Sequence, residues 1–435
     1  MSATRRIIPL LAVLVTITRA APLWRPFSAD SPWNQRIPAG AAPDRDSAGL
    51  IADFASRGAM HLNIKHWSIP VYFVDADRTP RHEVGDLRPG IYGAGFGFPR
   101  SIPIPDQAVA SPPVGEDSDN HLCIIDRAKN LEWGMWAARR DATGRWFTGL
   151  GAVTDLSGTG VAPPWFAARR ELDSHRARAG GFPLIAGLIR REEIQAGRID
   201  HALVFAYAHC RTGLFIPPAS TSQSAKQEAV DTRGIPMGGR IQLDPAWDAE
   251  HSGLSPAGRT IARALQEYGA YCGDYADGNV LYAENSPEAV REWAGVLHPD
   301  DLARVLTPEF IRAHFRVLDL GNLLPGQNLP VRPPYLLAFA LAGETAPARI
   351  DQLTRTVTVF PGGPPAPGAP ATWTLHPQGT LAAIDGRPVA SGTGLEVGAA
   401  LTLTLTAPDG ATNDWRIVRP PAGAPPAGPK GLPDD

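Results

Sequence analysis

Two histidines and a tyrosine mark the apolar segment 200–209, which reads DHALVFAYAH. If this segment is a β-strand, alternate side chains point to opposite faces, so His201, Tyr207 and His209 share one face. The other face then carries Asp200 and small apolar side chains, which suit packing against a second layer. Histidine transfers protons near neutral pH. We therefore expect the His201 face to line a groove, with Tyr207 as a second acid or base.

A second expected strand begins with His121, directly after Asp119 and Asn120. The next apolar run places Glu132 and Trp136 on one of its faces. If these strands are neighbours in one sheet, the side chains that converge are His121, Glu132, Trp136, His201 and Tyr207. A histidine at a strand end is also common as a plain hydrogen-bonded residue, and tryptophan as a packing residue. The prediction therefore depends on that pairing of strands.

Such a set of side chains could cleave a polysaccharide, because the ring of Trp136 can stack on a sugar. In hydrolysis, an acid protonates the leaving oxygen and a carboxylate, here Glu132 or Asp200, activates water or attacks. In β-elimination from a uronic acid, His and Tyr move the protons while Arg139 neutralises the substrate carboxylate. Hydrolysis is favoured, because acidic residues are plentiful near the histidines.

Further substrate-binding residues are expected after the clearest helical segment, where Tyr271 and Asp274 occur. Asp274 could form a carboxylate pair with Glu284 further along the chain. We expect Asp119, Asn120, Trp136, Arg139, Tyr271 and Asp274 to bind the substrate. The alternative for this second region is that its glycines and aspartates simply end a helix and form a hairpin turn.

We expect no metal and no cofactor. The three histidines near the expected groove lack the HxH or HExxH spacing that fixes metal geometry. The glycine-rich run 93–101 is not followed by a helical pattern, as a nucleotide loop would require, and no GxSxG occurs. The net charge of −3 provides no general basic field for nucleic acid.

The N-terminus has the pattern of a secretory signal peptide. Arg5 and Arg6 precede a short apolar run, and Thr18-Arg19-Ala20 suits cleavage after Ala20. The run is too short for a permanent transmembrane helix, and no later segment could cross a membrane. We therefore expect a secreted or periplasmic protein. An oxidising compartment permits one disulfide among Cys123, Cys210 and Cys272, with the pairing left open.

The elements that must position these residues are mainly β-strands. Short runs of β-branched and aromatic residues are separated by Gly, Pro, Asp and Asn, with local helical patterns between them. Helix starts are expected at Ser255, Ser286 and Thr307, each followed by proline. We expect residues 21–342 to form a two-sheet β-sandwich of jelly-roll type with helical insertions, and this part to be the catalytic domain.

Two later segments differ in composition. Residues 343–419 alternate strictly between apolar and polar residues, as in a sheet with one solvated face. The Pro/Gly-rich tail 420–435 is expected to be disordered. Within the alternating segment, APDGATNDWRIV resembles the last hairpin of the immunoglobulin-like or cadherin-like modules of bacterial exported proteins, with Asp409-Gly410 in the turn and Trp415 pointing inward. The resemblance implies a small immunoglobulin-like β-sandwich.

Three motifs in residues 30–310 resemble a group of uncharacterised exported bacterial proteins. They read SPWNQRIP, GFPLIAGLIRREEIQAGRIDHALVFA and ALQEYGAYCGD. The resemblance brings no assigned mechanism, but it implies that the Asp200-His201 and Asp119–His121 segments belong to one domain. The sequence thus predicts an exported carbohydrate-active enzyme acting on a polysaccharide by hydrolysis. A polysaccharide lyase and a non-catalytic glycan-binding or cell-surface protein remain as alternatives, and the oligomeric state stays open.

Overall fold

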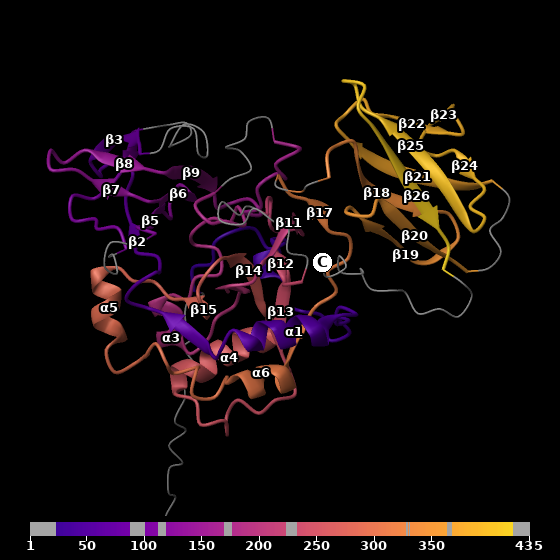
Figure 1. The fold of residues 1–435 in the computed structure, drawn as a ribbon. Helices are drawn as coiled ribbons and strands as arrows, with labels where there is room; N and C mark the ends of the chain where they lie inside the picture. The colour runs from indigo at the N-terminus through magenta and orange to yellow at the C-terminus, as the bar shows by residue number, and fades with distance from the viewer. Residues whose placement is uncertain are drawn as a thin grey trace, which may run out of the picture.

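The computed structural model describes residues 23–87, 101–111, 119–168, 176–222, 233–327, 329, 331–362 and 368–420. Within them the chain is mainly β, as the sequence predicts, with short helices between strands. The expected signal peptide, residues 1–20, and residues 421–435 of the expected tail lie outside the described residues. Figure 1 shows a central body with most of the helices, a group of small sheets beside it, and a separate C-terminal group of strands.

The central body contains a six-stranded mixed sheet. Its order is β1 (Met60–Asn63), β15 (Asn279–Tyr282), β10 (Leu203–Ala206), β14 (Ala270–Asp274), β13 (Arg240–Leu243) and β16 (Phe315–Val317). The β1–β15 and β10–β14 pairs are parallel, and the other pairs are antiparallel. The antiparallel pattern expected of a jelly roll is therefore not seen in this sheet. The sheet sets the position of Asp274, at the end of β14.

Helices lie around this sheet (Figure 1). They are the 3-10 helix η1 (Pro32–Asn34) and the α-helices α1 (Ser47–Ser56), α3 (Arg191–Ala196), α4 (Pro256–Glu267), α5 (Pro287–Trp293) and α6 (Pro308–His314). The predicted caps of α4, α5 and α6 are confirmed, because the hydroxyls of Ser255, Ser286 and Thr307 each accept a backbone N–H three residues later.

Two four-stranded sheets form the group beside the central body. The first has the order β2 (Val71–Phe73), β5 (Leu122–Asp126), β6 (Leu131–Trp136) and β9 (Leu150–Asp155). The second has the order β4 (Ser101–Pro103), β3 (Arg81–Asp86), β8 (Trp146–Thr148) and β7 (Arg139–Arg140). Every residue of β5 is buried. Because β5 and β10 belong to different sheets, the expected pairing of the His121 and His201 strands is wrong.

A three-stranded sheet lies near the junction with the C-terminal part. Its order is β12 (Pro236–Met237), β11 (Arg211–Phe215) and β17 (Leu324–Pro325). β17 pairs with β11 in antiparallel register, Leu324 opposite Phe215. The chain thus leaves the central body from a paired strand shortly before the C-terminal strands begin.

The C-terminal strands form two sheets with a hydrophobic core of their own. One has the order β18 (Tyr335–Leu341), β21 (Ala369–His376) and β24 (Gly394–Leu395). The other has the order β19 (Glu344–Asp351), β20 (Thr356–Pro361), β26 (Thr412–Val418), β25 (Ala400–Thr406), β22 (Leu381–Ile384) and β23 (Arg387–Val389). Trp415 is fully buried, as its alternation predicts. β18 begins before the expected boundary at residue 343 and contributes Leu336 and Phe339 to this core.

No helix in the described part of the chain is long and apolar enough to cross a bilayer.

Candidate active site

His201 does not share a hollow with His121. The strand β10 covers only Leu203–Ala206, so His201 precedes it and the predicted alternation from 200 to 209 is wrong. His201 is 4% exposed, with Nε2 2.9 Å from Oε1 of Glu193 and Nδ1 2.9 Å from the carbonyl oxygen of Ala202. Glu193 also pairs with Arg190 at 2.5 Å. Both nitrogens of His201 are thus engaged in a buried ionic network.

Tyr207 and Asp200, the other candidate residues of the segment 200–209, have structural partners as well. The hydroxyl of Tyr207 is buried and accepts the backbone N–H of Ile235. Asp200, which was expected to be a carboxylate partner in catalysis, pairs with Nε of Arg198 at 3.1 Å. The Tyr207 contact ties the end of β10 to Ile235, whereas the Asp200 contact is local to residues 198–200.

Glu132 is buried rather than facing a groove. Its carboxylate accepts the backbone N–H groups of Leu184 at 2.8 Å and Ile185 at 3.1 Å. Burial raises its pKa to about 7, against the effect of these two donors. Gly134 leaves room for this contact, because a Cβ there would lie 2.9 Å from Oε1 of Glu132. Glu132 therefore fixes the 184–185 turn on β6.

Four side chains from three chain segments do come together, and we call them the Asp119–Asp274 cluster: Asp119, His121, Arg178 and Asp274. The segment 177–180 joins them. The carbonyl oxygen of Ala177 lies 3.1 Å from Nε2 of His121, and the N–H of Ala179 donates to Asp274. The N–H of Gly180 donates to the carbonyl of Gly273 at 3.0 Å. This segment thus bridges the start of β5 and the end of β14.

His121 supplies a neutral imidazole. It is 2% exposed, and burial lowers its pKa, although the Asp119 carboxylate opposes this shift. A carbonyl oxygen only accepts hydrogen bonds, so Nε2 carries the proton that faces Ala177. Nδ1 is buried and has no hydrogen-bond partner among the described residues. The imidazole therefore presents an unused basic nitrogen.

Arg178 supplies a buried positive charge. It is 3% exposed, and its guanidinium lies 4.4 Å from the ring centre of Tyr282. Nη2 donates weakly to the carbonyl of Leu184 at 3.4 Å. Nε and Nη1 are buried without a hydrogen-bond partner in the described part of the chain. A buried guanidinium with two unused donors is unusual in a folded protein, because leaving such groups unsatisfied costs stability.

Asp274 has the properties of a proton donor at neutral pH. Burial, and then the nearby Asp119 carboxylate, raise its pKa to about 7, while Arg178 and the N–H groups of Tyr275 and Ala179 act in the opposite direction. Its Oδ1 lies 3.0 Å from the N–H of Tyr275. Asp274 keeps some exposed surface, so its proton can reach a ligand. The expected pair with Glu284 is not formed, because Glu284 binds Arg191 instead.

Asp119, Asn120 and Trp136 lie together at the edge of the cluster. Nε1 of Trp136 donates to Oδ1 of Asp119 at 3.2 Å, and the Trp136 side chain is half-buried. The carbonyls of Asp119 and Asn120 accept the N–H groups of Ala137 and Ala138 at 2.8 and 2.9 Å. These bonds attach the segment before β5 to the end of β6. The structure thus places two of the expected substrate-binding residues, Asp119 and Trp136, side by side.

The remaining two expected substrate-binding residues lie apart from the cluster. Arg139 is exposed on β7, opposite Phe147. Tyr271 is buried, and its hydroxyl lies 3.4 Å from the carbonyl of Pro32. Tyr271 thus anchors the N-terminal segment to β14 rather than facing a ligand.

Arg178 was missed from the sequence. It stands in the run RARAGG, which looks like a polar connection between strands. The two glycines after it are the available signal. Gly180 packs closely, since a Cβ there would lie 3.2 Å from the carbonyl oxygen of Gly273, and this approach places Arg178 beside Asp274.

No family model matches this chain, and no curated protein or solved structure matches it either. The expected kinship with exported bacterial proteins therefore stays a prediction. Among the described residues, no group of three or more His, Cys, Asp or Glu side chains is arranged to hold a metal ion.

Proposed function

We propose that this protein is an exported enzyme that cleaves glycosidic bonds in a polysaccharide by general acid–base catalysis. One observation carries the proposal. The segment 177–180 holds the imidazole of His121 and the carboxyl group of Asp274 beside the buried guanidinium of Arg178. Nδ1 of His121 and Nε and Nη1 of Arg178 have no hydrogen-bond partner among the described residues. Buried groups whose pKa values are shifted and whose bonding capacity is unused are typical of catalytic sites.

In hydrolysis, each group has a role that matches its protonation state. Asp274, with a pKa of about 7, protonates the leaving oxygen. Nδ1 of His121 removes a proton from the attacking water, and Asp119 stabilises the imidazolium that forms. Trp136, held by Asp119, offers a half-buried ring against which a sugar can stack. In this proposal Asp274 acts directly on the leaving oxygen and Asp119 acts through the imidazole of His121. Glu132 and Asp200, which the sequence suggested for the carboxylate role, take no part.

β-Elimination is the second candidate, and the unused donors of Arg178 favour it. A guanidinium with free Nε and Nη1 can bind the carboxylate of a uronic acid and stabilise the charge that develops when the C5 proton leaves. His121 would then remove that proton, and Asp274 would protonate the leaving oxygen. The residues are the same in both reactions, so only the product separates them.

The test uses the mature protein and a panel of neutral and uronic-acid polysaccharides. We expect new reducing ends without the ultraviolet absorbance of an unsaturated sugar; that absorbance would show elimination instead. Asp274→Asn should lower kcat by about 10²- to 10⁴-fold. The exposed acid Asp277 provides a matched control, since Asp277→Asn should keep full activity. Unchanged cleavage by Asp274→Asn would contradict the proposed role.

The proposal also includes export of the protein and an immunoglobulin-like fold of its C-terminal strands. A signal peptide at residues 1–20 would deliver the enzyme to the periplasm or outside the cell, where polysaccharides are found. An immunoglobulin-like arrangement of residues 343–419 is supported by the two sheets around the buried Trp415. Binding of a glycan without cleavage would favour the alternative of a non-catalytic surface protein.

A further inference from the structure

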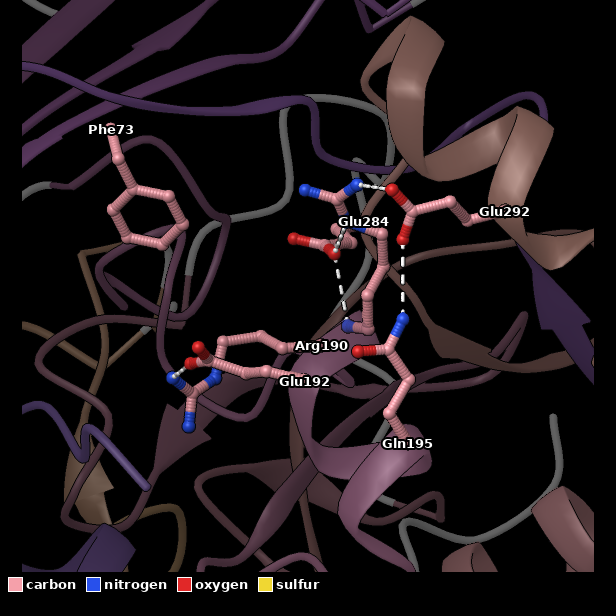
Figure 2. A pocket seen from close by; sticks show the side chains of 7 residues that line it. Phe73, Arg190, Glu192, Gln195, Glu284 and Glu292 are labelled. Atoms are coloured by element: carbon pink, nitrogen blue, oxygen red, sulfur yellow. Dashed lines mark hydrogen bonds and ion pairs between the residues drawn. The ribbon is translucent and has the colours of Figure 1, made fainter. Parts of the chain in front are cut away.

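A polar cavity is lined by residues of α3 and α5 and by none of the four residues of the Asp119–Asp274 cluster. Its volume is about 280 Å³. We call it the Phe73–Glu284 pocket; it is lined by Phe73, Arg190, Arg191, Glu192, Gln195, Glu284 and Glu292. Figure 2 shows Phe73 on one side, Glu284, Glu292 and Gln195 on the other, and Arg190 with Glu192 below. Phe73 lies opposite Ile125 at the far end of β5 from His121, about 14 Å along the strand.

Glu284 is a buried carboxylate that directs one oxygen into this pocket. It is 3% exposed. Its Oε1 accepts two hydrogen bonds from Arg191, from the backbone N–H at 2.9 Å and from Nε at 2.7 Å. The other oxygen points away from these donors, towards the side where Phe73 lies (Figure 2). Within the described residues, no hydrogen bond to that oxygen is formed, so an acceptor is held ready for a ligand.

The rest of the polar lining is fixed by its own contacts. Nη1 of Arg191 binds Oε1 of Glu292 at 2.5 Å, and Nε2 of Gln195 donates to Oε2 of Glu292 at 3.3 Å. Arg190 is engaged with Glu192 and Glu193. Because the cations and anions pair with one another, the pocket has little unpaired charge with which to attract an ion. A neutral ligand with several hydroxyl groups fits this lining best.

Phe73 adds an apolar ring that is held in place. Phe73 is 41% exposed, more than any other Phe, Tyr or Trp among the described residues. The guanidinium of Arg127 lies 3.8 Å from its ring centre, and Trp24 meets it edge-on at 5.8 Å. A rigid ring opposite fixed acceptors and donors needs little reorganisation on binding. Sugars present an apolar ring face and hydroxyls at its rim, which match these two sides.

We propose that the Phe73–Glu284 pocket is a non-catalytic binding site for one sugar ring of a polysaccharide chain. The ring stacks on Phe73, and its hydroxyls donate to Glu284 and bond to Arg191 and Gln195. The choice of a sugar over other polyols rests on the proposed function. The volume, at the low end for ligand pockets, holds a single ring rather than a long oligosaccharide.

The test measures binding separately from cleavage. Full-length protein carrying Asp274→Asn is titrated by calorimetry with cellohexaose, xylohexaose, laminarihexaose and chitohexaose. At least one should bind, and adding Phe73→Ala should weaken that binding about tenfold, as the loss of one stacked ring predicts. Glu284→Gln should weaken it as well, whereas Phe73→Tyr should preserve it. The exposed Leu381 of the C-terminal strands gives the matched control, since Leu381→Ala should bind unchanged.

Each outcome separates this site from the proposed catalytic one. Undiminished binding by Phe73→Ala, or no binding of any of the four hexaoses, would contradict the proposal that this pocket binds a sugar ring. Cleavage by the wild-type protein would still stand in either case. Conversely, loss of binding in Phe73→Ala together with full cleavage by Asp274→Asn would support the pocket and reject the catalytic assignment.

Discussion

In the Asp119–Asp274 cluster, one residue has a pKa above that of an exposed side chain of its type and another has a pKa below it. Burial raises the pKa of Asp274 to about 7 and lowers that of His121 below its usual 6.5. An acid and a base must be protonated and unprotonated at the same time to act together. The structure provides this combination between the lowered pKa of His121 and a pH of about 7.

The rate should therefore depend on pH as a bell-shaped curve. As pH rises through about 7, Asp274 loses the proton that it must donate, so kcat/KM falls. As pH falls below the lowered pKa of His121, the imidazole gains a proton and can no longer act as a base. Initial rates measured from pH 4 to 10 check this. A rate that keeps rising above pH 8 would be incompatible with Asp274 as the acid.

The three cysteines are free and buried in the structure. Sγ of Cys210 lies 3.4 Å from Sγ of Cys272, and burial raises the pKa values of Cys123 and Cys272 well above normal. Because the thiolate is the reactive form, the native protein should resist iodoacetamide. After unfolding without reductant, all three thiols should be alkylated, as mass spectrometry can count. Only one labelled thiol would show instead that Cys210 and Cys272 are joined.

At the scale of elements, α3 is attached to the start of β10 by the network of Arg190, Glu193 and His201. Removing the imidazole of His201 takes one of two cationic partners from the buried Glu193 carboxylate and leaves it with Arg190 alone. His201→Ala should therefore lower the free energy of unfolding by about 3 kcal/mol, as urea titration would measure. The kcat of the folded fraction should not change. A large loss of kcat with an unchanged free energy of unfolding would show instead that His201 is a catalytic residue.

The same network makes the free energy of unfolding depend on pH in the acid range. Burial opposes ionisation of Glu193, but His201 and Arg190 outweigh it and lower the pKa to about 2. A lowered pKa in the folded state gives stability that is present above the unfolded value of about 4.5 and is lost as pH falls towards 2. This contribution is about 3 kcal/mol. Glu193→Gln should flatten the pH dependence of the unfolding free energy between pH 5 and 2; an unchanged slope would contradict this.

Local elements were predictable from the sequence, whereas strand length and pairing were not. The starts of α4, α5 and α6 follow from a capping hydroxyl and a proline that act within one turn. The start of β10 at Leu203 depends on its pairing with Ala270 of β14, which lies far along the chain. The alternating pattern at 200–209 carries no information about where the strand begins, so His201 was assigned to the wrong environment.

The candidate site was predictable in part for the same reason. Asp119, His121, Trp136 and Asp274 stand out by residue type beside strands, and the structure groups them. Arg178 completes the cluster through backbone contacts of the segment 177–180, which no local pattern reveals. Glu132 has a suitable type and position, but a pattern of polar and apolar residues does not distinguish a carboxylate that binds backbone N–H groups from one in a groove.

At the scale of the whole molecule, the chain has separate hydrophobic cores. The largest extends from Phe27 to Leu320, and another is confined to the C-terminal strands between Leu336 and Ile417. A few contacts join the two parts. The side chain of Asn322 donates to the carbonyl of Ala348 and accepts the N–H of Ile350, both at 2.9 Å. All residues of the Asp119–Asp274 cluster and of the Phe73–Glu284 pocket lie before this connection.

Because the central body and the C-terminal strands each have a hydrophobic core of their own, these two parts should unfold in separate steps. Calorimetry of the mature protein should show two transitions rather than one, since chains with more than one core depart from two-state behaviour. A protein ending at residue 333 should keep the first transition and cleave a soluble polysaccharide at nearly the full rate. Its control is Asn322→Ala in the full chain, which removes the bridge to β19 and should leave both transitions present. Loss of folding in the shortened chain would show that the central body depends on the C-terminal strands, through the apolar contact of Leu214 and Leu329 with Tyr335.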